Sequence, residues 1–307
     1  MDNEKVVLFG AGRIGKRVYE TANADIVAVI DNNLENLDVS VWEVPIISID
    51  EYIEKYSGIK IWITVLKVAE IENQLKNRGI FNYSIPIEVY ETGNVGHDED
   101  ISHEKWVKYI IDMYDKDGYK VLEVGSRVVT GARIGRLFKH AQYTGFDYYD
   151  GENVDVIGDI HKLSSYFSEK FDLIFCSAVF EHLAMPWIAS KEMIKCLKTG
   201  GCIFVETHYS YSSHERPWHF FQFSENALNI LFPEAFGIKC LKKGCSNLIK
   251  ARFSEKASKY LIGNVINDMY CHSEFLGQKV EDKDIDSIKW EDLSLENVVG
   301  STEYPRP

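Results

Sequence analysis

The sequence predicts an α/β protein that contains two parallel-sheet units in tandem. Apolar runs of strand length alternate with runs of helical periodicity in residues 5–79, and the same alternation restarts in residues 104–207. Several apolar runs end in glycine or aspartate. Parallel sheets often bind ligands through these residue types at the carboxyl ends of their strands. The length of 307 residues allows each unit to bury a core of its own.

The first unit carries a glycine motif between its first strand and first helix. Its expected elements are strands over residues 5–9, 25–31 and 59–66, and helices over residues 16–22 and 68–78. Gly10, Gly12 and Gly15 follow the first strand, and Asp31 ends the second. This order of glycines and acid is the dinucleotide-binding pattern.

The second unit repeats the alternation after a polar segment. Its expected elements are helices over residues 104–114, 134–140 and 187–197, and strands over residues 119–125, 142–147, 154–159, 171–177 and 202–207. The charge-rich segments 250–260 and 282–292 are expected to be solvated helix faces. The patterns predict a first domain over residues 1–92, a linker over 93–102, a second domain over 103–255, and a C-terminal extension over 256–307 that packs on the second domain.

Composition excludes several classes of partner. Asp and Glu number 47 against 34 Lys and Arg, so the net charge is −13. Without a dense basic cluster, this charge disfavours nucleic-acid and membrane partners. Six cysteines without a Cys-x-x-Cys pair, and no signal-peptide or membrane-spanning pattern, predict a cytoplasmic protein with reduced thiols. A homo-oligomer is compatible with the sequence.

Residues at the expected strand ends of the second unit suit a nucleoside ligand. Gly125 ends the first strand and allows close approach of the backbone. Asp147 ends the second, where a carboxylate can accept both ribose hydroxyls, and Asp159 ends the third. Each residue is a weak signal alone, but their order and spacing together predict a cofactor site.

Residues 119–238 resemble the class I S-adenosylmethionine-dependent methyltransferases. The resemblance rests on five motifs, at residues 121–126, 143–147, 158–163, 171–183 and 196–201. It implies a class I methyltransferase fold in the second of two Rossmann-like domains, and S-adenosylmethionine as cofactor. The cofactor contacts that it implies are Glu123, Gly125 and Ser126 at the methionine end, Asp147 at the ribose, Asp159 and Ile160 at the adenine, and also Ser177.

The glycine motif of the second unit departs from the family pattern. Arg127 stands where the family usually has a second glycine. We include Arg127 among the expected cofactor contacts, because its guanidinium can pair with the methionine carboxylate. The alternative is that Arg127 points to solvent.

The first unit resembles the small N-terminal domain of bacterial sugar-modifying acetyltransferases, on residues 29–33 and 48–52. That domain binds a nucleotide-sugar. The resemblance implies that Gly10, Gly12 and Gly15 face a diphosphate and Asp31 a ribose or base. NAD binding and a purely structural unit remain open as alternatives.

Four histidines are candidates for the general base. Methyl transfer needs an aligned acceptor, and a hydroxyl acceptor must also lose its proton, a role that suits neutral histidine. The candidates, which follow the fourth and fifth strands, are His182, His208, His214 and His219. His208 is the first choice, because Glu206 lies two residues before it on the same strand face and can orient the imidazole.

Aromatic residues and a partial metal motif accompany these histidines. Tyr209 and Trp218 are the expected acceptor-binding aromatics. Glu181 and His182 partly match the Glu-x-x-Glu-His metal motif of ubiquinone-pathway O-methyltransferases and small-RNA 3′-end methyltransferases, but Ala178 replaces the first glutamate. The sequence therefore predicts a reaction without a metal.

Together these observations predict a methyltransferase that acts on a small molecule. The expected acceptor is a hydroxyl of a sugar or nucleotide-sugar in surface-glycan (polysaccharide) biosynthesis. An NAD-dependent oxidoreductase that uses the first unit, and a non-catalytic nucleotide-binding module, are the alternatives.

Overall fold

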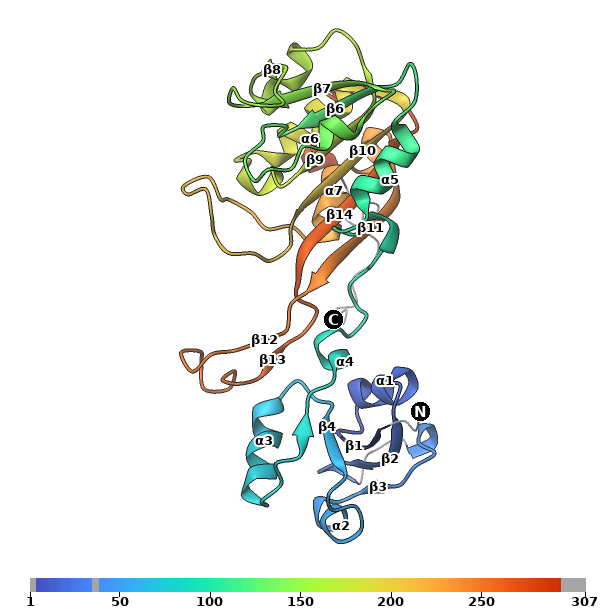
Figure 1. Cartoon of the computed structure of the whole chain (residues 1–307), viewed down its shortest axis with the longest axis vertical. Coiled ribbons are helices and arrows are strands. Elements are labelled where there is room, and N and C mark those ends of the chain that lie inside the picture. Colours follow the sequence, from blue (N-terminus) through green and yellow to red (C-terminus); the bar gives the residue numbers. More distant parts are fainter. Residues whose placement is uncertain (1–3, 35–38, 294–307) are drawn as a thin grey trace. The chain divides into compact units, whose positions relative to one another are not determined.

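The computed structural model of the chain describes residues 4–34 and 39–293. The chain divides into two compact units (Figure 1). The smaller one comprises the described parts of residues 1–94 together with residues 248–269. The larger one comprises residues 95–247 and the described residues after 269.

The smaller unit is built on a five-stranded parallel sheet with the strand order β3-β2-β1-β4-β5. The strands are β1 (Lys5–Phe9), β2 (Asp25–Ile30), β3 (Ile46–Ile47), β4 (Lys60–Ile63) and β5 (Tyr83–Ser84). The helices are α1 (Arg13–Thr21), α2 (Ile49–Lys55), α3 (Val68–Asn77) and α4 (Ile87–Tyr90), with a short 3₁₀ helix at Val39–Val41. Central strands buried on both faces explain the continuous apolar runs of the sequence.

A local sequence signal fixes the start of α2 in this unit. At α2, Ser48 Oγ accepts a hydrogen bond from the Glu51 N–H over 3.2 Å, and Glu51 Oε2 accepts one from the Ser48 N–H over 3.0 Å. This capping box satisfies two N–H groups that would otherwise lack partners.

Residues 248–269 belong to the smaller unit, which corrects the domain boundary expected at residue 255. They form a hairpin of β12 (Ala251–Arg252) and β13 (Val265–Ile266). The Val265 N–H donates to the Leu66 carbonyl, and Arg252 forms an ion pair with Glu72 over 2.9 Å. Because these partners are about two hundred residues away in the sequence, local pattern could not reveal the pairing.

The larger unit contains a seven-stranded sheet with the order β11-β14-β10-β9-β6-β7-β8. The strands are β6 (Lys120–Val124), β7 (Gln142–Asp147), β8 (Val156–Ile157), β9 (Phe171–Ser177), β10 (Leu197–His208), β11 (Ile238–Leu248) and β14 (Tyr270–Lys279). Strand β14 runs antiparallel to β10. The sequence predicted only five of these strands; β14, expected in an extension packed on the domain, is part of the sheet itself.

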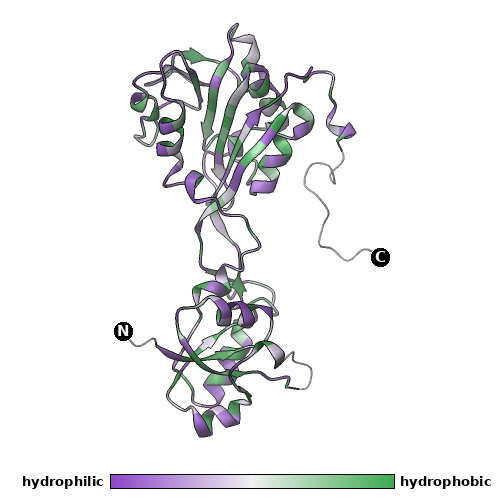
Figure 2. Ribbon diagram, turned by 90° about the vertical axis from the view of Figure 1, so that its right-hand side faces the viewer, coloured by the Kyte–Doolittle hydropathy of each residue, from purple (hydrophilic) through white to green (hydrophobic). Residues whose placement is uncertain are grey.

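Helices and short 3₁₀ turns flank this sheet. The helices are α5 (Trp106–Tyr114), α6 (Pro186–Cys196) and α7 (Glu225–Leu231). The 3₁₀ turns are Glu99–Ile101, Ile134–Leu137, Ile160–Ser165, Phe180–His182, Glu234–Phe236 and Trp290–Asp292. Hydrophobic residues concentrate on the central strands, whereas the surrounding loops are mostly hydrophilic (Figure 2).

Three expected helices are not α-helical. The segment 134–140 holds only a 3₁₀ turn, so the loop after β6 leads into no α-helix. Residues 250–260 contain β12 and turns, and residues 282–292 are irregular up to a 3₁₀ turn. Charge-rich composition without an apolar stripe gives a helix no face to bury, which is why composition alone misled the prediction.

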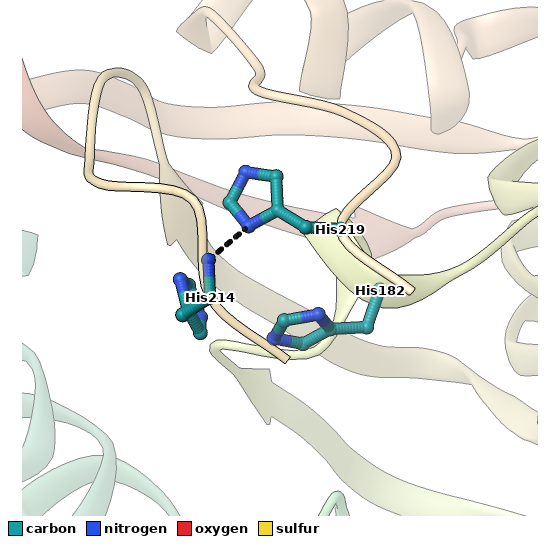
Figure 3. Close-up of side chains that lie close together, drawn as sticks. All are labelled: His182, His214 and His219. Carbon is teal, nitrogen blue, oxygen red and sulfur yellow. Dashed lines mark hydrogen bonds between the residues drawn. The ribbon is translucent and has the colours of Figure 1, made fainter. Parts of the chain in front are cut away.

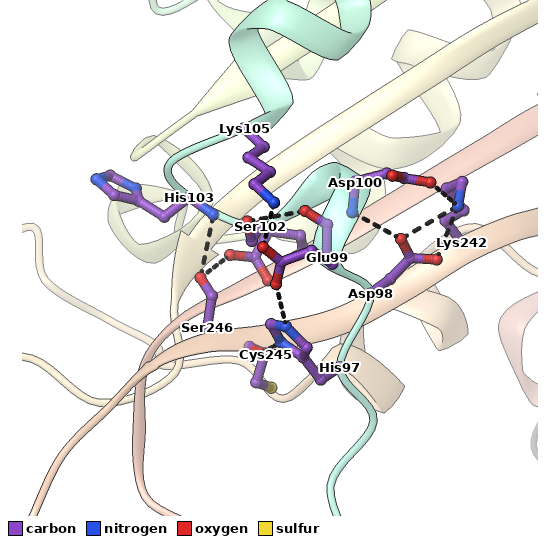
Figure 4. A network of polar contacts seen from close by, with 11 residues as sticks. His97, Asp98, Glu99, Asp100, Ser102, His103, Lys105, Lys242, Cys245 and Ser246 are labelled. Carbon is purple, nitrogen blue, oxygen red and sulfur yellow. Dashed lines mark hydrogen bonds and ion pairs between the residues drawn. The ribbon is translucent and has the colours of Figure 1, made fainter. Parts of the chain in front are cut away.

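The expected linker, residues 93–102, is mostly part of the larger unit. His97 Nδ1 lies 2.9 Å from the Cys245 carbonyl, which can only accept, and Lys242 bonds Asp98 and Asp100 over 3.0 and 2.8 Å (Figure 4). These contacts hold the segment against β11. The polar composition that predicted a linker reflects this ion-pair network instead.

In the described ranges, none of the helices combines the length and the apolar character needed to cross a membrane.

Candidate active site

The residues expected to bind a cofactor lie at the carboxyl ends of parallel strands. Gly125 and Ser126 follow β6, Asp147 ends β7, Asp159 follows β8, and Ser177 ends β9. These four strands run parallel, so their ends share one edge of the sheet. That edge is where sheets of this kind bind ligands.

The turn after β6 exposes bare backbone at this edge. Gly125 has a φ of 81°, and a Cβ at this position would collide with Val179. Ser126 is buried, and its Oγ has no hydrogen-bond partner among the described residues. Because a buried hydroxyl without a partner costs free energy, Ser126 Oγ is available to a ligand atom.

The Glu123 carboxylate is buried and engaged within the protein. The Tyr143 hydroxyl donates to it, and Asn153 Nδ2 donates to it over 3.4 Å. Burial raises the pKa of Glu123 to about 7, against the lowering effect of these hydrogen bonds. Asn153 also donates to the Ser126 carbonyl over 2.9 Å. In this structure Glu123 therefore stabilises the turn after β6 through its hydrogen bond with Asn153, which also bonds the Ser126 carbonyl.

The Arg127 side chain lies against Asp147 rather than pointing freely to solvent. Its Nε lies 3.5 Å from Asp147 Oδ1, and its backbone N–H donates to Asp147 Oδ2 over 3.3 Å. The guanidinium also lies over the Tyr149 ring, 5.5 Å from its centroid. Tyr149 N–H adds a bond of 2.9 Å to Asp147 Oδ1. Since a carboxylate offers about four lone-pair sites, acceptor capacity remains on Asp147.

Asp159 and Ile160 follow β8 as expected. Asp159 Oδ1 accepts from the His161 N–H over 3.0 Å and lies 2.7 Å from His161 Nδ1. Burial opposes the ionised form, but these bonds outweigh it and lower the pKa of Asp159. Ile160 is buried beside this carboxylate.

The four candidate histidines come together at the same end of the sheet. His182 lies on the turn after β9, His208 ends β10, and His214 and His219 lie on the loop that follows. Ring centroids are 4.8 Å apart for His182 and His214, 4.9 Å for His214 and His219, and 5.3 Å for His208 and His214. Figure 3 shows the rings of His182, His214 and His219 close together, and the planes of each pair lie 77–88° apart.

The carboxylate beside His208 is Glu181, not the expected Glu206. Glu181 Oε1 lies 2.9 Å from His208 Nδ1, and Glu181 Oε2 accepts from the Thr207 hydroxyl over 2.6 Å. Burial would raise the pKa of Glu181, but His208 and Thr207 outweigh it and lower the pKa. The strand pattern misled here, because the turn after β9 brings Glu181 close from another element.

Glu206 belongs to a second polar cluster that the sequence did not predict. Its carboxylate accepts from Ser177 Oγ over 2.9 Å and lies 2.8 Å from His103 Nδ1. The His103 ring stacks on His272, with centroids 3.8 Å apart. Ser177 thus donates to Glu206, a partner that the expected cofactor role did not foresee.

Two further members of that cluster have strongly shifted pKa values. Burial lowers the pKa of His272 to about 4 and raises that of Glu274 to about 8. Both lie on β14, where His272 pairs with His208 and Glu274 with Glu206. Residues 270–279 do not alternate between polar and apolar, because three polar residues, 272–274, precede two apolar ones, so no strand pattern in the sequence could have revealed them.

The expected aromatic residues lie near the histidines but in different environments. Trp218 is exposed, and its carbonyl lies 2.9 Å from His182 Nδ1. The Tyr209 N–H donates to the Cys271 carbonyl over 2.9 Å. Tyr211, another aromatic residue of the same segment, stacks on His208 with centroids 4.5 Å apart. An aromatic face next to His208 is suited to an apolar ligand surface.

The glycine motif of the smaller unit forms a tight turn between β1 and α1. Gly10 has a φ of 120°, and a Cβ at Gly15 would collide with the Gly10 carbonyl. Helix α1 begins after Gly12 with no side-chain cap and no acidic residue in its first turn. Asp31 accepts from the Ala11 N–H over 2.7 Å, so its carboxylate holds the motif in place.

The larger unit has the class I methyltransferase fold, in which a parallel sheet carries one antiparallel strand, here β14 beside β10. A family model described as a methyltransferase domain matches residues 122–205, from β6 into β10.

Similar proteins include methyltransferases of low identity. (S)-Coclaurine N-methyltransferase of Papaver somniferum is 25% identical over an alignment of 196 positions, which covers 53% of this chain and 55% of that protein. The chain therefore spans about half the length of this curated relative. The solved YcgJ protein from Bacillus subtilis matches with a TM-score of 0.41 at 17% identity, over 58% of this chain and all of that one. The plantazolicin methyltransferase BamL, solved with a desmethyl substrate analogue and SAH, has a TM-score of 0.41 at 15% identity, over 57% and 82%.

Proposed function

We propose that this protein is an S-adenosylmethionine-dependent methyltransferase that acts on a small molecule. The observation that carries the proposal is the seven-stranded sheet order of the larger unit, together with the methyltransferase-domain match over its first half. The ligand-binding edge of that sheet holds the expected acidic residues and an open turn. The named methyltransferases among the similar proteins support the same activity.

The residues at this edge fit the cofactor. Gly125 offers backbone without a side chain, Ser126 offers an unpartnered hydroxyl, and Asp147 keeps acceptor capacity for ribose hydroxyls. Asp159 and Ile160 would hold the adenine as polar and apolar neighbours. When bound, the cofactor supplies an electrophilic methyl group on a sulfonium. Arg127 lies beside Asp147 and can stay paired with it while the ribose binds. Its guanidinium can also move toward the carboxylate of the cofactor.

The histidine cluster is proposed to receive the acceptor. A buried carboxylate beside His208 Nδ1 favours the neutral tautomer with hydrogen on Nδ1, which leaves Nε2 to accept a proton. His208 is therefore our first candidate for the base of a hydroxyl acceptor. The aromatic faces of Tyr211 and Trp218 would suit the apolar face of a sugar ring.

The acceptor we propose is a hydroxyl of a sugar or nucleotide-sugar of surface-glycan synthesis in the cytoplasm. Its support is the tight glycine turn between β1 and α1 in the smaller unit. We propose that Gly10, Gly12 and Gly15 bind the diphosphate of such a ligand, with Asp31 near its ribose or base. The name of the curated relative makes a nitrogen acceptor the alternative.

The experiment measures cofactor binding and methyl transfer separately. Titration calorimetry should detect S-adenosylmethionine binding, and Asp147→Ala should weaken it roughly 30- to 150-fold, the loss of about 2–3 kcal/mol from a charged acceptor. Asp150→Ala, an exposed aspartate on the same loop, is the matched control. Labelled methyl transfer to a panel of nucleotide-sugars and amines then identifies the acceptor.

Two outcomes would contradict the proposal. Equal affinity of the Asp147→Ala variant and the parent protein would place the cofactor elsewhere. An absence of binding in the parent protein would favour a non-catalytic module, and nicotinamide cofactor binding would favour an oxidoreductase.

A further inference from the structure

His182, His214 and His219 form a group whose side chains converge from two elements. One ring nitrogen of each lies within 4.8 Å of those of the other two. His182 comes from the turn after β9, and the other two come from the loop after β10 (Figure 3). Imidazole nitrogens at such separations can share one ion after small side-chain rotations.

Hydrogen bonds to the backbone set the tautomers of two of these rings. His182 Nδ1 lies 2.9 Å from the Trp218 carbonyl, and His214 Nδ1 lies 2.9 Å from the Ser212 carbonyl. Carbonyl oxygens only accept, so both Nδ1 atoms carry hydrogen. In the neutral rings, each Nε2 then keeps a lone pair. Metal-binding histidines in proteins are oriented in this way, by a backbone acceptor on the other nitrogen.

His219 adds a third ring, and its Nδ1 is the nitrogen that keeps a lone pair in the neutral form. Its Nδ1 accepts a long hydrogen bond of 3.5 Å from the His214 N–H. Its Nε2 is buried and has no hydrogen-bond partner in the described part of the chain. Because Nδ1 is the acceptor, Nε2 carries the hydrogen of the neutral ring.

A buried carboxylate borders the three rings. Glu181 has no exposed surface, and its Oε2 accepts a hydrogen bond from the Thr207 hydroxyl. Its Oε1 lies 3.9 Å from His182 Nε2 and 2.9 Å from His208 Nδ1. Lone pairs that converge beside a buried negative charge repel one another unless a cation lies among them.

We propose that His182, His214 and His219 bind one divalent transition-metal ion of the Zn²⁺ type, with Glu181 as the neighbouring negative charge. Three imidazoles with remaining open positions suit Zn²⁺ or Co²⁺ better than Mg²⁺, which prefers oxygen ligands. This site goes beyond methyl transfer and does not depend on the proposed function. It departs from the metal-free reaction that the sequence predicted.

The test must distinguish this group of three histidines from a second group of possible metal ligands. Glu181, His208 and His214 also place one ligand atom each within 4.8 Å of the others. The proposal assigns Glu181 and His208 to each other as a carboxylate–imidazole pair. Because the two triads share only His214, His219→Ala removes a ligand from the first alone, and His208→Gln removes one from the second alone.

The experiment measures metal content and Co²⁺ spectra of the full chain without S-adenosylmethionine. Chelator-treated protein should take up about one Zn²⁺ per chain, and Co²⁺ should give visible absorption bands of a nitrogen-ligated site. His214→Ala and His219→Ala should lose at least tenfold in Zn²⁺ affinity, while His208→Gln and the exposed His140→Ala should retain it. Circular dichroism checks that each variant is folded.

Other results would overturn the proposal. Failure of the parent protein to take up Zn²⁺ or Co²⁺ would do so, as would equal uptake by the folded His219→Ala variant. Loss of the metal in His208→Gln but not in His219→Ala would move the site to the second triad. S-Adenosylmethionine binding is measured separately from metal uptake. A protein that takes up no metal can therefore still be a methyltransferase, and a protein that binds no S-adenosylmethionine can still bind the metal.

Discussion

At the scale of single residues, the position of a carboxylate decides which histidine is prepared for proton transfer. His208 has Glu181 beside its Nδ1 and Tyr211 stacked on its ring. Trp218 and Ser212 carbonyls, by contrast, hold the Nδ1 atoms of His182 and His214. His208 has the closer charged partner, because Glu181 Oε1 lies 2.9 Å from its Nδ1 but 3.9 Å from His182 Nε2.

We expect His208→Gln to lower turnover by about 10²–10⁴-fold, the usual contribution of a general base. Glutamine keeps a polar side chain of similar reach but cannot take the proton. The affinity for S-adenosylmethionine, measured by calorimetry, should not change, and His140→Ala serves as the exposed control. Near-normal turnover of the glutamine variant would show that alignment alone drives the reaction or that the acceptor is already ionised.

Glu274 predicts a pH dependence of stability. Burial raises the pKa of Glu274 to about 8, well above that of an unfolded glutamate. Between these two values the folded protein holds more protons than the unfolded chain, so the free energy of unfolding falls as the pH rises from about 4.5 to 8.

Glu274→Gln should flatten this fall. The free energy of unfolding of the variant, relative to that of the parent protein, should therefore be higher at pH 8 than at pH 5. Urea unfolding at both values measures the change. Glu281→Gln, at an exposed position, is the control and should follow the parent protein. Parallel pH profiles of the parent protein and the Glu274→Gln variant would contradict the assignment.

At the scale of elements, each unit has a glycine-containing turn after a strand, which is where we propose that its ligand binds. The turn after β1 depends on Gly10 and Gly15 for space, but Gly12 differs from them. It has an ordinary φ of −78°, and a Cβ there meets no atom within 4 Å. A side chain at Gly12 therefore points into open space, where a ligand would approach α1.

This freedom makes Gly12→Val a clean test of the smaller unit. The fold should survive, while nucleotide-sugar binding, measured by equilibrium dialysis, should fall at least tenfold because the isopropyl group fills the place of a phosphate. S-Adenosylmethionine affinity should stay the same. If the valine variant binds nucleotide-sugars as well as the parent protein does, or if neither binds them, the smaller unit has a structural role.

At the scale of the whole molecule, each unit has a core of its own, but the chain passes between the units more than once. The smaller unit includes the hairpin 248–269, and its core includes Val265. The larger unit includes β14, which follows that hairpin in the sequence. A single cut near residue 102 therefore does not separate the two units.

The larger unit should fold alone only if both boundaries are respected. We expect residues 95–293 with a short turn in place of 248–269 to fold and bind S-adenosylmethionine. The Ile249 N–H donates to the Met269 carbonyl over 2.7 Å, so a turn can join the cut ends. A version that begins at residue 103 loses His97, Asp98 and Asp100, which bind β11, and should melt at a lower temperature. Equal melting temperatures would contradict this account.

Much of the fold could be predicted because its signals are local. The strand over residues 171–177 agrees with β9 and that over 142–147 with β7, since buried strands carry continuous apolar runs between turn residues. The predicted cofactor residues Gly125, Asp147 and Asp159 lie at strand ends for the same reason. The four histidines also gather, because the ends of β9 and β10 meet at one edge of the sheet.

The sequence by itself thus determined the two α/β units, the ligand-binding edge and the group of histidines. Tertiary structure alone decided that Glu181 is the partner of His208, that Arg127 lies against Asp147, and that β14 joins the sheet with His272 and Glu274. It also placed residues 248–269 in the smaller unit. The physical reason is that periodicity records which face of an element is buried, whereas pairing between distant segments depends on three-dimensional packing that no local pattern encodes.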